Sequence, residues 1–212
     1  MGMGTTRRIW LGTIVAVVIS ACSSAGSTTT TDPIVPSVPA DWTTYADGAF
    51  SIMYPADWQV FSIDETLIGD VMADVGDFRG GILMAAGLPG GDGSYSPNVN
   101  VIAEPAPVGG DLDRYVELSR RNIESLFSSY EVTRTDRTTI DGREAVVVGG
   151  SYDLAELSEG AEGRWWVIQL VTLVEDTGWT VSCGTSGPDE ASVVDEIDRC
   201  RAVAASFRIV GS

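Results

Sequence analysis

Two successive β-hairpins constrain the fold of this chain most strongly. The pair Asp141-Gly142 lies between two strand-like stretches, and an Asp-Gly pair in this context is a strong signal for a two-residue hairpin turn. A second, slightly longer turn is predicted at residues 176–178. The four strands are expected at residues 130–140, 143–152, 165–175 and 179–183. Strands joined by such short turns must be antiparallel, because parallel neighbours need a long crossover connection.

Further strands and two helices complete the predicted domain. Alternating or continuously apolar runs predict strands at residues 49–54, 58–61, 82–86 and 98–103. Asp111 is placed to cap a helix that carries apolar residues at helical spacing as far as Phe127. A last helix is expected to start at Pro188, with an apolar stripe from Val193 to Phe207. Two helices against a mostly antiparallel sheet predict an α+β domain with one core.

The N-terminus has the three parts of an export signal. Arg7 and Arg8 precede an apolar run from Ile9 to Ile19, which is shorter than the roughly 20 residues that a transmembrane helix needs. The run ends in Ile-Ser-Ala-Cys22, which is similar to the bacterial lipobox, in which the Cys thiol is acylated. The sequence therefore predicts a lipoprotein signal peptide at residues 1–21. An ordinary signal peptide with a chance Cys, or an uncleaved short anchor, is the alternative.

The segment that follows separates the predicted anchor from the predicted domain. Residues 22–41 are rich in Ser, Thr and Pro and have almost no apolar periodicity, which is typical of a flexible linker. The folded domain is expected at residues 42–212. Acyl chains on Cys22 would hold this domain stably at the extracytoplasmic face of the cell membrane.

The charged residues exclude several classes of function. All 13 basic residues are arginines, and the chain has no Lys and no His. Ser-His-Asp triads, Cys-His dyads, His-ligated metals, Schiff-base lysines and lysine-bearing phosphate loops are therefore impossible. The 30 acidic residues give a formal net charge of −17, which argues against nucleic acid as a partner. We expect no cofactor and no metal.

Two cysteines remain once Cys22 carries lipid. Cys183 ends the second hairpin, and Cys200 lies on the apolar stripe of the last helix. Export permits disulfides, so the two are predicted to form a structural disulfide that stabilises the fold by about 3 kcal/mol. The alternative is a redox or metal-binding pair, but no CxxC motif and no His accompany them.

A glycine-rich loop at residues 87–97 is the first candidate for a binding surface. It has no Lys and no helix directly behind it, so it is interpreted as a hairpin loop rather than a phosphate loop. Because long loops on rigid scaffolds often carry binding, the candidate partner-binding residues are Gly90, Gly91, Asp92 and Tyr95.

An acidic stretch precedes this loop. Its members are Asp64, Glu65, Asp70, Asp74 and Asp77. They lack the spacing of a calcium-binding loop, and the last three would line one face of a helix. We interpret the stretch as a solvated acidic face, with a weak divalent-cation site as the alternative.

Several segments, taken in order, resemble PsbP-like domains. The stretch DGAFSIMYPADW at residues 47–58 resembles the opening of that family. Residues 98–101, the helix around Asp113-Arg114-Tyr115, the hairpin at 141–145 and Ser206-Phe207 follow in the family's order. Among members with a lipobox, the chain is similar to the LpqN-type lipoproteins of mycobacteria and related actinobacteria. The resemblance implies an α/β/α sandwich and a binding or assembly role without turnover. The metal ligands of plant relatives include His, so no metal residues are implied for this chain.

These observations favour a binding module over an enzyme. We expect no catalytic residues, and a lipid-anchored extracytoplasmic module of the cell envelope that acts through an envelope or secreted protein partner. One alternative is a lipoprotein that binds a small apolar ligand or an envelope lipid. A second alternative is a hydrolase that uses two carboxylates, although the sequence singles out no pair.

Overall fold

The computed structural model describes residues 37–61, 81–88, 96–106, 110–157 and 160–210. All of them belong to one compact unit, Pro33–Ser212. The predicted signal peptide, Cys22 and most of the predicted linker lie outside the described residues. In the described ranges, no helix is both long enough and apolar enough to cross a membrane.

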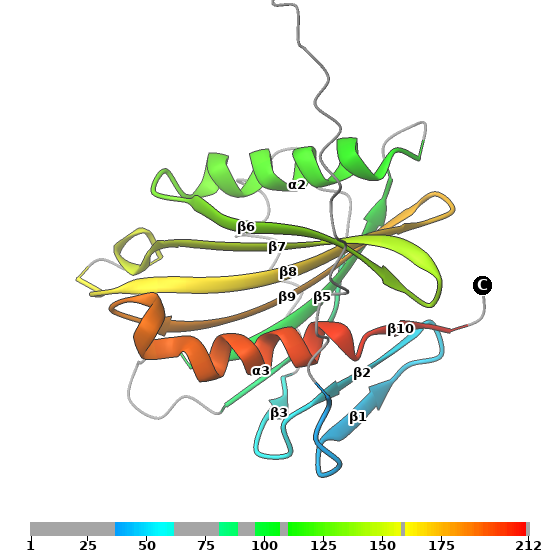
Figure 1. The fold of residues 1–212 in the computed structure, drawn as a ribbon, viewed down its shortest axis with the longest axis horizontal. Helices are drawn as coiled ribbons and strands as arrows, with labels where there is room; N and C mark the ends of the chain where they lie inside the picture. Colours follow the sequence, from blue (N-terminus) through cyan, green and yellow to red (C-terminus); the bar gives the residue numbers. More distant parts are fainter. Residues whose placement is uncertain (1–36, 62–80, 89–95, 107–109, 158–159, 211–212) are drawn as a thin grey trace, which may run out of the picture. The chain divides into compact units, whose positions relative to one another are not determined.

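A seven-stranded sheet forms the centre of the described domain (Figure 1), and every neighbouring pair of its strands is antiparallel. In their order across the sheet, the strands are β3 (Gln59–Val60), β4 (Gly81–Gly87), β5 (Asn98–Pro105), β9 (Thr177–Gly187), β8 (Arg164–Val174), β7 (Arg143–Asp153) and β6 (Glu131–Ile140). The prediction of an antiparallel sheet is confirmed.

Both predicted hairpins are present, with one correction. Asp141 and Gly142 have φ angles of 51° and 77°, and positive values at both central residues are what a two-residue turn of the hairpin type requires. The prediction of a longer second turn is wrong, because Val174 pairs with Thr177 and only two residues connect the strands. Glu175, the first of these two residues, has a φ of 53°. Positive φ is uncommon for residues other than glycine, so the sequence does not predict this conformation.

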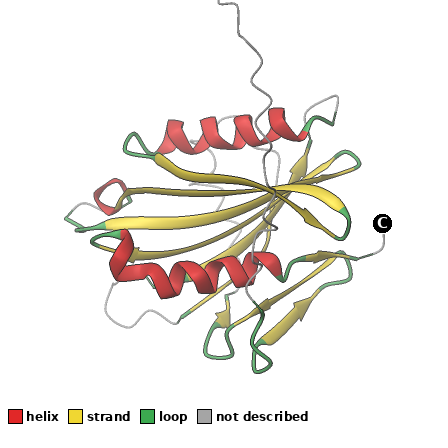
Figure 2. Ribbon diagram, in the orientation of Figure 1, coloured by secondary structure: helices red, strands yellow, loops and turns green. Residues whose placement is uncertain are grey.

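One helix lies on each face of the seven-stranded sheet (Figures 1 and 2). Tyr115 of α2 (Leu112–Leu126) packs in a cluster with Val171 of β8. The cluster that includes residues of α3 (Val194–Ala205) contains Leu170, the preceding residue of the same strand. Successive side chains of a strand point to opposite faces of its sheet. The chain is thus an α+β domain with the α/β/α arrangement expected from the sequence.

The start of α2 follows the prediction. The Asp111 carboxylate accepts hydrogen bonds from the backbone N–H groups of Asp113 at 2.9 Å and Arg114 at 3.3 Å. These N–H groups have no partner within the helix, so the cap stabilises its first turn.

The predicted start of the last helix at Pro188 is wrong. The Asp189 carboxylate accepts a hydrogen bond from the Ser192 N–H at 2.9 Å and caps a short 3-10 helix, η2 (Glu190–Val193). The α-helix begins only after this tighter turn, at Val194. Asp189 therefore acts as a cap of η2 rather than as an acidic residue in the first turn of α3.

The buried face of this segment agrees with the sequence. All five residues of the predicted stripe are buried, namely Val193, Ile197, Cys200, Ala204 and Phe207. Cys200 forms a disulfide with Cys183 of β9, with the two Cα atoms 5.2 Å apart, and neither residue is more than 1% exposed. The disulfide fastens α3 to the sheet.

A second sheet of three strands was not fully predicted. It consists of β1 (Thr43–Ala46), β2 (Phe50–Tyr54) and β10 (Arg208–Ile209), with β2 in the middle. Ser206 ties the end of α3 to this sheet, since its Oγ accepts a hydrogen bond from the Met53 N–H at 2.8 Å. Strands as short as β10 carry too few residues for an alternating pattern to be visible.

Aromatic rings lie directly on glycines of β9. A Cβ atom at Gly184 would lie 2.4 Å from Nε1 of Trp165, and one at Gly178 would lie 2.3 Å from Cζ of Tyr115. Each ring fills the space that a side chain would take. These two glycines are required for packing rather than for a turn.

Candidate functional site

The site residues predicted from the sequence lie largely outside the described residues. This holds for Cys22, for the loop residues Gly90, Gly91, Asp92 and Tyr95, and for the acidic stretch from Asp64 to Asp77. They remain predictions. Cys183 and Cys200 are described, and as a buried disulfide they hold the fold together.

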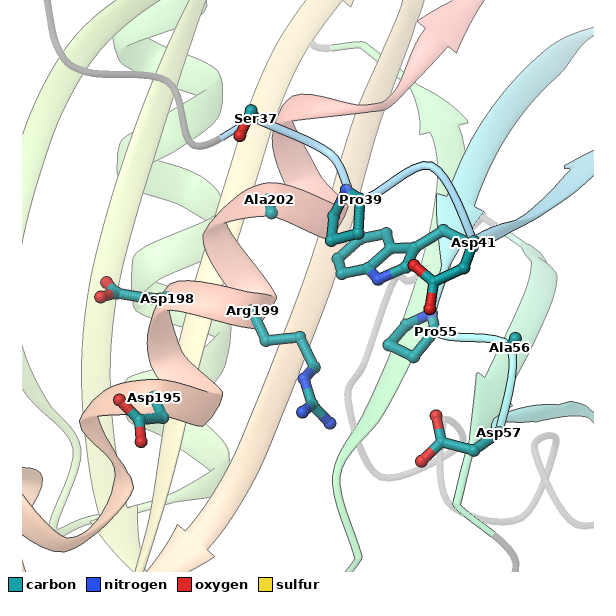
Figure 3. Close-up of a pocket in the computed structure, with 11 residues that line it drawn as sticks. Ser37, Pro39, Asp41, Pro55, Ala56, Asp57, Asp195, Asp198, Arg199 and Ala202 are labelled. Atoms are coloured by element: carbon teal, nitrogen blue, oxygen red, sulfur yellow. The ribbon is translucent and has the colours of Figure 1, made fainter.

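An open groove with a volume of about 640 Å³ lies beside α3 (Figure 3). Three segments line it: the chain that leads into β1, the turn that follows β2, and one face of α3. The lining residues are Ser37, Pro39, Asp41, Trp42, Pro55, Ala56, Asp57, Asp195, Asp198, Arg199 and Ala202.

Local structure brings these segments together. The Trp42 N–H donates to the Pro39 carbonyl at 3.3 Å, and the Trp58 N–H donates to the Pro55 carbonyl at 3.0 Å, so both chain segments turn beside the groove. The α3 residues are spaced by three, four and seven positions from Asp195, which places them on one helix face.

The groove has an apolar floor and an acidic rim. Pro55 and Ala202 are buried, and Trp42 is partly buried and packs against the main core. The four aspartates of the lining, Asp41, Asp57, Asp195 and Asp198, are exposed. An apolar centre with a polar rim is the general anatomy of protein interfaces.

Three of these carboxylates are uncompensated. Within the described ranges, Asp41, Asp57 and Asp195 form no ion pair, whereas Asp198 pairs with Arg201. The rim therefore carries a surplus of negative charge.

Arg199 is the cation of the groove lining. Its side chain extends from α3 into the space that faces the Asp57 turn (Figure 3). One of its guanidinium nitrogens lies 3.3 Å from a carboxylate oxygen of Glu196, one helical turn away, and both side chains are partly exposed. Because the pair is partly exposed, water weakens the attraction between the two charges.

Among the described residues, the carboxyl groups whose pKa values clearly depart from the ordinary value are shifted downward. No group of three or more His, Cys, Asp or Glu in these ranges is arranged to hold a metal ion. Hydrogen bonds from Arg120 and Arg121 lower the pKa of Glu117, and hydrogen bonds from Ser129 and Ser128 lower the pKa of Glu156. A general acid needs a raised pKa instead.

Among the described residues, Tyr115 has the most strongly shifted pKa. Burial raises the pKa of its hydroxyl well above the usual value. The hydroxyl donates to Glu104 Oε1 at 2.7 Å and lies 3.3 Å from Thr180 Oγ1. Those contacts satisfy a buried polar group between α2 and the sheet, which is a structural role.

Sequence reasoning missed the groove. Asp41, Asp57 and Asp195 are separated by up to 154 positions in the chain, and nothing in their spacing links them. A signal exists on α3, where Asp195, Asp198 and Ala202 recur at helical spacing on the face beside the apolar stripe. The opposite wall consists of the chain that leads into β1 and the turn after β2, and its position beside α3 depends on the tertiary packing of the small sheet.

No family model matches the chain, and no curated protein matches its sequence. The fold is nevertheless found among solved structures. The cyanobacterial PsbP, CyanoP, from Synechocystis is 14% identical, with a TM-score of 0.54, and the match covers 90% of this chain and 98% of that protein.

Two further solved structures share the fold. LpqN of Mycobacterium tuberculosis is 12% identical, with a TM-score of 0.51 over 80% of this chain and 91% of LpqN. A variant of Mog1 is also 12% identical, with a TM-score of 0.50 over 81% of this chain and 96% of Mog1. At such low identities the likeness shows a PsbP-like fold.

Proposed function

We propose that this chain is a binding module without catalytic activity, which lipid on Cys22 holds at the extracytoplasmic face of the cell membrane and which acts through a protein partner. The observation that carries this proposal is the open groove with its apolar floor and acidic rim. It has the make-up of a docking surface, because exposed carboxylates surround apolar residues along an open groove.

The position of the groove in the chain supports a role close to the anchor. Ser37 lines the groove and lies 15 positions after Cys22. A chain of this length spans on average about 20 Å as a flexible coil and about 50 Å when fully extended. A lipid anchor at Cys22 would therefore keep the groove near the membrane surface. Partners within reach are envelope proteins and proteins in transit through the envelope.

The similar structures support an envelope role in general terms. LpqN is described as involved in cell envelope biogenesis. The lipobox-like sequence before Cys22 is also the feature that the LpqN-type lipoproteins share. We therefore propose a role in the cell envelope, as a binding or assembly module, for this chain as well.

Anchoring is tested with Cys22→Ala. The wild-type protein, expressed in a lipoprotein-processing bacterium, should incorporate labelled palmitate and sediment with membranes. The variant should carry no label and appear in the soluble extracytoplasmic fraction. An unlabelled wild-type protein in the soluble fraction would contradict the proposed anchor.

Partner binding is tested by crosslinking in intact cells, followed by affinity purification from detergent-solubilised envelope. The Cys22→Ala protein serves as a control for contacts that only the membrane enforces. A specific protein recovered repeatedly with the wild type supports the proposal. Recovery of no protein, together with measurable turnover of a substrate, would overturn it.

A further inference from the structure

We propose that the groove beside α3 binds a basic segment of the partner, an extended peptide that carries Arg or Lys on either side of an apolar residue. This inference deepens the proposed function, because it names the chemistry that the docking surface recognises. It stands on the geometry and charge of the described groove.

The first step is the apolar floor. Pro39 and Ala56 are exposed and Trp42 is partly exposed, so these three lining residues present apolar surface to an occupant, whereas Pro55 and Ala202 are buried. An apolar side chain placed over this floor removes its own surface and the exposed surface of Trp42, Pro39 and Ala56 from water, which favours binding. A floor of this kind selects an occupant with at least one apolar residue.

The second step is the charge of the two walls. Asp57 lies on the wall formed by the turn after β2, and Asp195 lies on the wall formed by α3 (Figure 3). Neither forms an ion pair in the described part of the chain. A peptide that lies along the floor therefore meets an uncompensated carboxylate on each side, and basic side chains flanking the apolar residue match this arrangement.

The third step is Arg199, whose effect has the opposite sign. Its guanidinium extends into the groove, and the one ion pair that it forms among the described residues is the partly exposed pair with Glu196. An anionic occupant, such as a phosphate or a lipid headgroup, would need this arginine. A basic occupant is repelled by it. The charge at position 199 therefore distinguishes the two chemistries.

The test uses fluorescence anisotropy with a short labelled peptide of alternating Arg and Leu, and with matched peptides that carry Gln or Glu in place of Arg. We expect binding of the Arg peptide only. Asp57→Asn combined with Asp195→Asn should weaken it by about tenfold, and Arg199→Gln should tighten it by about twofold to fivefold. Raising the salt concentration from about 50 to 300 mM should weaken it further, because the rim charges are exposed.

The matched control removes the same charge elsewhere. Glu144 and Asp176 are exposed and have no ion pair in the described ranges, and Glu144→Gln with Asp176→Asn should leave the affinity unchanged. The protein is acidic as a whole, so equal weakening by both double variants would mean attraction to net charge alone and would overturn the proposal. Tight binding of the Glu peptide, with loss on Arg199→Gln, would overturn it in favour of an anionic occupant.

The outcome separates this inference from the proposed function. If the Asp57→Asn, Asp195→Asn variant still recovers the same envelope partner as the wild type, the partner binds elsewhere and the groove inference is wrong while the binding role stands. Loss of the partner from this variant, with its retention by the Glu144→Gln, Asp176→Asn control, supports both.

Discussion

Replacing Gly184 by Ala tests the packing of aromatic rings on the sheet. The new Cβ would lie 2.4 Å from Nε1 and 2.6 Å from Cε2 of Trp165, where ordinary contact begins near 3.4 Å. The indole is buried in its own apolar cluster, so ring and strand must shift by about 1 Å against packed neighbours. Overpacking of this kind costs about 1–3 kcal/mol, and the lost flexibility of the unfolded chain returns about 0.5 kcal/mol. The expected net loss of unfolding free energy is about 1–2 kcal/mol.

Urea unfolding, followed by Trp fluorescence, measures this loss. With a slope near 2 kcal/mol per M, the midpoint should fall by about 0.5–1 M. Gly81→Ala is the matched control, because a Cβ at Gly81 meets no heavy atom within 4 Å, and its midpoint should stay within about 0.3 M of the wild type. In a Trp165→Leu background the Gly184→Ala change should cost nothing. Equal midpoints for the two glycine variants, or a cost that persists without the indole, would refute the reasoning.

Three further predictions concern covalent, capping and titrating groups. Replacing Cys183 and Cys200 by Ala opens a loop with a sequence separation of 17, and the unfolding free energy should fall by about 3 kcal/mol; reduction should destabilise the wild type but leave this variant unchanged. Asp111→Ala removes the cap of α2 and should cost about 1 kcal/mol in urea unfolding, whereas Asp111→Asn should retain most of the stability. Glu156 has a lowered pKa in the folded state, so its contribution is present above its ordinary pKa of 4.5 and is lost as the pH falls below that value. Glu156→Gln should therefore lower the melting temperature near pH 7 but not near pH 3, and an equal effect at both would contradict this.

The sheet was predictable from the sequence because short local motifs specify its turns. Asp141-Gly142 specifies both the turn and the antiparallel direction of β6 and β7, and the apolar stripe of α3 specifies which helix face is buried. The positive φ of Glu175 was not predictable, because no residue type other than glycine signals such a conformation in the sequence. The pairing of β8 with β9 on either side of the turn imposes it.

The candidate site was less accessible to sequence reasoning than the fold. Asp57 and Asp195 become neighbours of one groove only because β2 and α3 pack together, and that packing joins residues far apart in the chain. Charge patterns report on a local segment, whereas the groove is a property of the tertiary arrangement. The glycine-rich loop was predicted as a binding surface from its composition. Composition does not indicate where the fold creates a concave surface.

The small sheet has a consequence for the order in which the chain acquires its structure during synthesis. Arg208 pairs with Ser51 and Ile209 with Phe50, and the Val210 N–H donates to the Ala49 carbonyl at 2.8 Å. Contacts of such long sequence separation raise the contact order and slow folding, because the loop between them must be closed first. A chain that emerges with its N-terminus first, from a ribosome or from a translocation channel, cannot complete this sheet until the segment around Ile209 has also emerged. Until then β2 has only β1 beside it, and the unpaired edge is open to chaperones and to proteases.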